Sequence, residues 1–157
     1  GLDVPLTQLL EPMFFEEHPL GFEPVRRVTP ESPFRFTAAW QRRALDEAAD
    51  DPDGFFGRRI AIDTAAMPTI AVHVQRWQPG FESRPYRTAA NQAFVVMQGR
   101  GTSVVDGIEM AWRFGDTFVA PCWKTVRHRA DEESVLVSMS DEPVMRFCKY
   151  WRFEAQD

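Results

Sequence analysis

The sequence predicts a mainly β protein: a small antiparallel barrel of the jelly-roll kind, preceded by a helical N-terminal extension. Two observations favour this class. From residue 58 onward the chain consists of short runs rich in β-branched and aromatic residues, separated by Gly, Pro or Asp turns. Before residue 58 the apolar pattern is helical or irregular. We therefore divide the chain into an extension, residues 1–57, and a barrel, residues 58–157.

The extension contains two expected helices. Apolar residues recur at helical spacing over residues 5–16, which predicts an amphipathic helix whose partner could lie outside this chain. Residues 19–33 carry several prolines without a period, and predict an extended crossing. A second helix is expected from residue 37 or 38 to 49, with Trp40, Ala44, Leu45 and Ala48 on one face. The Asp- and Gly-containing run 50–54 ends it.

The barrel follows as a series of short strands. They are expected at 58–63, 69–77, 91–98, 101–106, 117–120, 125–129, 134–140 and 145–153. The Asp106-Gly107 pair predicts a tight hairpin turn, because both residue types tolerate positive φ. That many brief strands at close intervals indicate a sandwich or a barrel.

Composition narrows the function classes. A length of 157 residues fits one domain, and no apolar run approaches the roughly 20 residues of a membrane helix. The N-terminus lacks a secretory signal pattern, so we expect a cytoplasmic location. A net charge of −5 argues against nucleic-acid binding, and basic pairs such as Arg58-Arg59 are interpreted as solvated surface. The two cysteines, Cys122 and Cys148, are expected to be reduced and packed.

The turn glycines and strand lengths between residues 79 and 128 have the spacing of a cupin. More specifically, the chain resembles the C-terminal cupin half of a gentisate 1,2-dioxygenase or 1-hydroxy-2-naphthoate dioxygenase. These are two-barrel enzymes that cleave aromatic rings beside Fe(II). Four stretches carry the resemblance: Gly1–Leu6 with Phe14–Glu16, Pro33–Phe36, Gly99–Trp123, and Ser138–Val144.

The resemblance implies a partner and a cofactor outside these residues. The stretch around Gly1–Leu6 resembles the link between two barrels, so we expect a fragment of a longer protein whose N-terminal cupin domain precedes it. Fe(II) and the O2-dependent cleavage of a hydroxylated aromatic acid are then expected in that other barrel. A homo-oligomer is also implied, as such enzymes form one.

The metal-ligand positions of this barrel depart from the pattern. A metal-bearing cupin uses His-x-His and a carboxylate in its first motif and a further His in its second. Alignment on the resemblance places Tyr86 and Thr88 at the two histidines, Gln92 at the carboxylate and Val126 at the remaining histidine. Valine cannot ligate, and a neutral amide, phenol and alcohol are poor partners for Fe(II). We predict neither a metal nor catalytic residues in this domain.

Two alternatives remain open. His73, His128 and Cys122 could form a relocated metal site, since His128 shares a strand face with Val126. Alternatively, the interior could hold a small aromatic acid without metal, with Arg84 or Arg87 pairing its carboxylate. The sequence does not decide which arginines face inward, and large apolar residues could instead fill the interior. The favoured function is a scaffold and oligomerisation half; the rivals are a stand-alone binding cupin and a cupin dioxygenase with relocated ligands.

Overall fold

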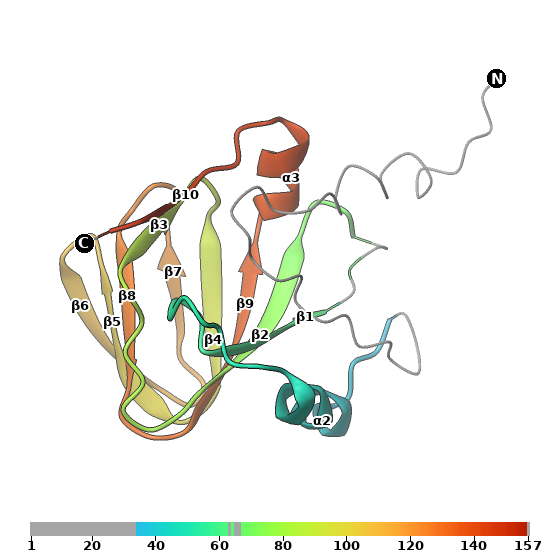
Figure 1. Cartoon of the computed structure of the whole chain (residues 1–157), viewed down its shortest axis with the longest axis vertical. Coiled ribbons are helices and arrows are strands. Elements are labelled where there is room, and N and C mark those ends of the chain that lie inside the picture. The colour runs from blue at the N-terminus through green and yellow to red at the C-terminus, as the bar shows by residue number, and fades with distance from the viewer. Residues whose placement is uncertain (1–33, 63, 65–66, 157) are drawn as a thin grey trace.

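The computed structural model describes residues 34–62, 64 and 67–156. The expected helix over 5–16 and the crossing over 19–33 lie outside them. The described part is built from two five-stranded antiparallel sheets, which face each other in Figure 1. The first sheet has the order β1 (Arg58–Ile62), β2 (Ala71–Trp77), β9 (Ser134–Ser140), β4 (Gln92–Gln98), β7 (Thr117–Ala120). The second has the order β10 (Phe153–Ala155), β3 (Tyr86–Thr88), β8 (Val126–Ala130), β5 (Arg100–Val105), β6 (Ile108–Arg113).

Helix α2 (Ala38–Glu47) confirms the second expected helix, and it ends two residues before the predicted limit. Thr37 caps it, because its hydroxyl accepts a hydrogen bond from the backbone N–H of Trp40 at 3.2 Å. Its apolar face buries Trp40, Ala44 and Leu45 against the outer face of the first sheet, where it meets Ile60 and Val74. Figure 1 shows the helix beside β1 and β2.

The prediction of a strand over residues 145–153 is wrong. Helix α3 (Glu142–Phe147) occupies its first part, and only β10 is extended. The sequence there is rich in β-favouring residues. However, Pro143 lies in the first turn of the helix, where proline is tolerated, and Glu142 forms an ion pair with Arg146 at 2.7 Å. The expected series of strands also lacks β3 and β6. The Asp106-Gly107 hairpin, which joins β5 to β6, is confirmed, with φ values of 50° and 82° at its two turn residues.

The space between the sheets is filled by aromatic and aliphatic side chains. The cluster contains Phe55, Phe56, Trp77, Tyr86, Phe94, Val96, Val105, Trp112, Phe118, Ala120, Val126, Ala130 and Leu136. Gly101 allows the indole of Trp112 to approach β5, since an added Cβ would lie 2.6 Å from that ring. Small-barrel interiors are filled in this way when they hold no large ligand.

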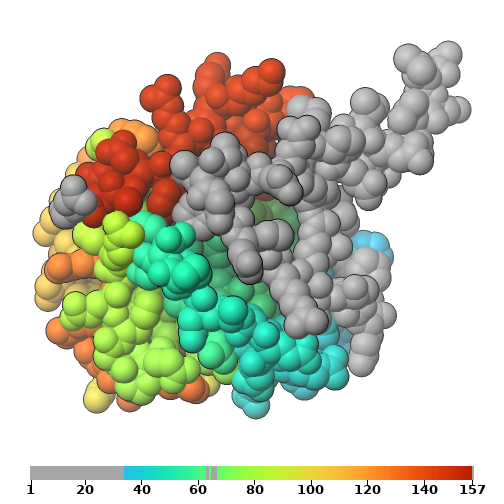
Figure 2. All heavy atoms as spheres, viewed as in Figure 1, coloured from blue at the N-terminus to red at the C-terminus, as the bar shows by residue number. Residues whose placement is uncertain are grey.

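The C-terminal segment closes one side of the barrel. In Figure 2 it meets the residues just before β1 and just before β3 in one continuous surface. Backbone hydrogen bonds join these segments: Gln156 N–H to the Pro85 carbonyl, and Arg84 N–H to the Gly54 carbonyl, both at 2.9 Å. Among the described residues, no helix has the length and apolarity that a membrane crossing demands.

Candidate functional site

The positions aligned with metal ligands meet inside the barrel. Tyr86 on β3 and Val126 on β8 are direct partners in the strand register. Because side chains alternate along a strand, His128 points inward beside Val126, as the sequence pattern predicted. All three side chains are buried. Gln92 reaches the same place from β4 in the opposite sheet.

A chain of hydrogen bonds runs through these residues. The Tyr86 hydroxyl lies 3.3 Å from Gln92 Oε1 and 3.3 Å from His128 Nε2. On the other side of the imidazole, Nδ1 lies 2.8 Å from Ser103 Oγ, which also accepts a hydrogen bond from Trp112 Nε1–H at 2.9 Å. Five side chains from β3, β4, β5, β6 and β8 therefore form one polar path across the interior.

The available donors and acceptors allow only one arrangement of donated hydrogen bonds along this path. The Tyr86 hydroxyl donates to Gln92 Oε1, so its oxygen is free to accept from His128 Nε2–H. Nδ1 is then the unprotonated ring nitrogen and accepts from the Ser103 hydroxyl. Neutral His128 in its Nε2–H tautomer thus satisfies every member of the path, which is the condition for a stable buried polar network.

Aromatic rings isolate the path from water. Trp77 stacks on the His128 imidazole at a centroid distance of 4.9 Å, and Phe94 meets it edge-on at 5.1 Å. Burial lowers the pKa of His128 to about 3 and raises the pKa of the Tyr86 phenol above its usual value. Both groups are neutral at physiological pH as a result.

This donor set does not fit Fe(II). Val126 offers no ligand atom, and the Thr88 hydroxyl bonds to the backbone of Ala90, donating to its carbonyl at 3.0 Å and accepting from its N–H at 3.2 Å. Tyr86 is a neutral phenol, and His128 Nε2 carries a proton toward it. Within the described part of the chain, no three or more His, Cys, Asp or Glu side chains gather closely enough to hold a metal.

The relocated trio is not brought together in the described residues. His73 lies on β2 in register with Ser138, while Cys122 is exposed in the turn between β7 and β8. Burial, reinforced by the charge of Arg59, lowers the pKa of His73 well below its ordinary value. Cys148 is exposed as well, so the expectation of packed cysteines is wrong.

The arginines considered for an inward role lie toward the outside. Arg84 is exposed and stacks over the Phe55 ring at 4.9 Å. Arg87 lies 4.6 Å over the Trp123 ring, and its Nη2 pairs with Glu154 at 2.8 Å. Both cations are thus held by surface contacts.

Sequence reasoning missed Arg59. It was interpreted with Arg58 as solvated surface, and Arg58 does pair with Asp50 at 3.2 Å. Arg59 faces the opposite way, 3.9 Å over the Phe56 ring. Burial lowers the pKa of its guanidinium, an effect opposed by the carboxylate of Glu142. The available signal was the alternation along β1: Ile60 packs under α2, so its neighbour Arg59 must point to the barrel side.

Comparison with known proteins supports the resemblance. Gentisate 1,2 dioxygenase 1 of Aquipseudomonas alcaligenes is 27% identical over 97% of this chain and 52% of its own length. The 5-aminosalicylate 1,2-dioxygenase of a Comamonas species is 34% identical over 57% of this chain and 24% of its own. This chain therefore spans about half or less of these curated relatives. No family model matches the chain.

Solved structures confirm the fold. The salicylate 1,2-dioxygenase of Pseudaminobacter salicylatoxidans superposes with a TM-score of 0.71 at 24% identity, covering 76% of this chain and 38% of that enzyme. The same fold is indicated by the two facing antiparallel sheets, by the sequence relatives and by this superposition. The chain therefore has a cupin fold and is similar in sequence to gentisate 1,2-dioxygenase and 5-aminosalicylate 1,2-dioxygenase.

Proposed function

We propose that these residues form the metal-free, structural cupin of a two-barrel dioxygenase that cleaves a hydroxylated aromatic acid, with Fe(II) held by an N-terminal cupin. The division into an extension, 1–57, and a barrel, 58–157, is part of this proposal. One observation carries it. The place where a cupin would hold a metal is occupied by a satisfied chain of neutral hydrogen-bonding groups under aromatic rings.

A structural role in assembly has its own support. An apolar row crosses the outer face of the first sheet, where Val72, Met139, Ala93 and Val119 are register partners on β2, β9, β4 and β7. Val119 and Met139 are 57% and 39% exposed. Apolar surface shared by several strands is typical of a contact with another protein surface. We assign this row to contacts within a homo-oligomer.

The metal-free part is tested by loading the purified chain with Fe(II) under anaerobic conditions, desalting it and measuring iron by mass spectrometry. We expect far less than one equivalent to remain. Retention near one equivalent, lost on replacing His73 or His128, would instead establish relocated ligands and overturn the proposal.

The assembly part is tested by light scattering after gel filtration. Val119→Lys is expected to shift the chain toward monomer, because a charge cannot be buried unpaired in an apolar contact. Ile108→Lys is the matched control, since Ile108 is 67% exposed on β6 in the other sheet. Equal behaviour of both variants would remove the outer row from the interface.

A further inference from the structure

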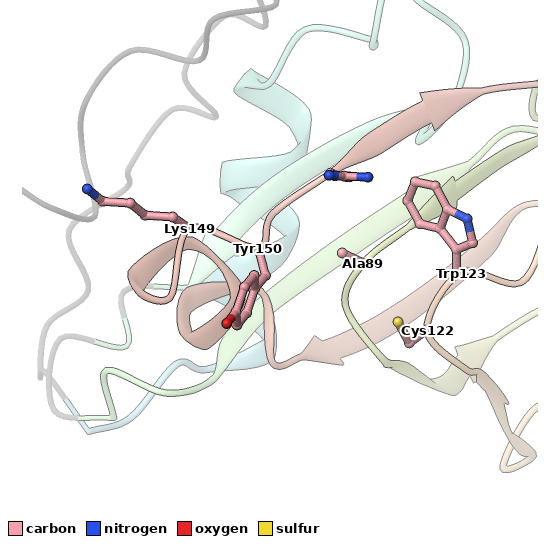
Figure 3. Close-up of a pocket in the computed structure, with 6 residues that line it drawn as sticks. Ala89, Cys122, Trp123, Lys149 and Tyr150 are labelled. Atoms are coloured by element: carbon pink, nitrogen blue, oxygen red, sulfur yellow. The ribbon is translucent and has the colours of Figure 1, made fainter.

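A separate pocket lies outside the barrel interior. Its cavity volume is about 310 Å3, and it is lined by Ala89, Cys122, Trp123, Lys149, Tyr150 and Arg152. Figure 3 shows Trp123 and Cys122 on one side and Tyr150 on the other, with Ala89 between them. The Lys149 side chain points away from Trp123, Cys122 and Ala89, so its ammonium group is directed out of the pocket.

Hydrogen bonds fix the three segments that form the pocket. Trp123 N–H donates to the Thr88 carbonyl at 2.7 Å, and Ala89 N–H donates to the Arg152 carbonyl at 2.9 Å. Cys122 N–H donates to Asn91 Oδ1 at 3.0 Å, and the Asn91 amide donates in turn to Asp141 Oδ2 at 2.7 Å. The pocket is therefore preformed, as small-molecule sites usually are.

The conformation of Trp123 is unusual. Its φ is 63°, in the left-handed region that bulky residues rarely adopt. Lys149, which also lines the pocket, has a φ of 61°. Only one other non-glycine residue with positive φ occurs in the described part of the chain, Asp106 in its hairpin turn. An aromatic residue held in this region at a cavity wall is a reason to look for a function there.

The lining combines aromatic rings with free positive charge. Seven cationic side chains of the described residues pair with carboxylates, including Arg87 beside this pocket and Arg146 on α3. Arg152 and Lys149 have no such partner among the described residues, although the whole chain carries a net charge of −5. Unpaired guanidinium beside Trp and Tyr faces suits a planar anion, because guanidinium pairs bidentately with a carboxylate and rings stack.

We propose that this pocket binds a small aromatic carboxylate, with its ring between Trp123 and Tyr150 and its carboxylate on Arg152. A volume of about 310 Å3 is at the lower limit for ligand pockets, which favours a single ring over a nucleotide or a longer chain. The inference is independent of the proposed function, because none of these residues belongs to the barrel interior.

The chain carries its own reporter for this site. Cys122 lines the pocket, while Cys148 is exposed but does not line it. Benzoate at millimolar concentration should slow alkylation of Cys122 by iodoacetamide and leave Cys148 unchanged, as followed by peptide mass spectrometry. Benzamide, the neutral analogue, and acetate, the anion without a ring, should protect far less.

Variants separate binding from general effects. Arg152→Gln should weaken benzoate protection roughly 10- to 100-fold, the usual range for a lost charge-assisted hydrogen bond. Arg113→Gln, an exposed cation on β6, is the matched control and should retain protection. Trp123→Gly should abolish protection, and the variant should still fold, since glycine accepts the positive φ. Equal protection of both cysteines, no protection of Cys122, or full protection in Arg152→Gln would each overturn the proposal.

Discussion

Tyr86 and His128 lie 42 residues apart in the sequence, yet the phenol oxygen and the imidazole Nε2 are 3.3 Å apart inside the barrel. Each has a second partner, Gln92 for the phenol and Ser103 for the imidazole. The pair is thus the middle of a path that joins both sheets. Its contribution to stability and its protonation can be measured directly.

Removal of the Tyr86 hydroxyl should destabilise the fold. Tyr86→Phe keeps the ring but leaves Gln92 Oε1 and His128 Nε2–H without this buried partner, at a cost of about 1–3 kcal/mol. Urea unfolding measures the loss. The chain has only one other tyrosine, Tyr150, which is 70% exposed, and Tyr150→Phe should change stability by less than about 0.5 kcal/mol. Equal effects of the two variants would contradict the buried path.

Stability should fall in mild acid. The folded-state pKa of His128, about 3, is below its ordinary value of 6.5, so the unfolded chain binds a proton between these values and the folded protein does not. The contribution is therefore complete above about pH 6.5 and is lost as the pH falls toward about 3, at up to about 1.4 kcal/mol per pH unit. His73, whose pKa is also lowered, adds a slope of the same sign.

Urea unfolding of wild type and His128→Gln between about pH 4 and 7 tests this linkage. The variant should be less stable at neutral pH but show a shallower dependence on pH. An unchanged slope would mean that burial does not lower the pKa of His128 in the folded protein.

Arg59 should be replaceable by an apolar side chain. Its guanidinium is desolvated over the Phe56 ring, and the Glu142 carboxylate that opposes this cost is already paired with Arg146. Replacement of a desolvated charge by a well-packed apolar group is often neutral or stabilising. Arg59→Met is thus expected to hold or raise the melting temperature. Arg58→Met loses an ion pair with the exposed Asp50 and a long hydrogen bond of 3.5 Å to the Leu45 carbonyl, and should change it little. A clear drop for Arg59→Met alone would show that the guanidinium stabilises the fold.

Much of the fold could be predicted from local pattern. The run 134–140 alternates between buried and less buried residues, and β9 has the predicted limits. Helix α2 was predictable because its apolar residues have helical spacing and Thr37 precedes them. Helix α3 was not, since Val144 and Phe147 are β-favouring in isolation, and the features that support the helix are a proline in its first turn and one ion pair.

The candidate site was only partly predictable for a related reason. Tyr86, Gln92 and His128 could be named from spacing and resemblance, and alternation correctly turned His128 inward. Ser103 and Trp112 complete the same path but come from β5 and β6, whose alignment with β8 depends on the register of distant strands. The pocket beside Trp123 is formed by three segments that lie far apart in the sequence, so no single stretch of sequence reveals it.

Ser103 fixes the direction of the buried path, because its hydroxyl bonds to both His128 and Trp112. Ser103→Ala removes both the donor to His128 Nδ1 and the acceptor for Trp112 Nε1–H, and should cost about 1–3 kcal/mol. Thr102→Ala, on the outward-facing neighbour in β5, should cost less. Because Tyr86 and Ser103 bond to opposite nitrogens of one imidazole, the double variant with Tyr86→Phe should depart from additivity by about 0.5–3 kcal/mol. Strict additivity would mean that the two bonds form independently, and that the single tautomer deduced for His128 does not link them.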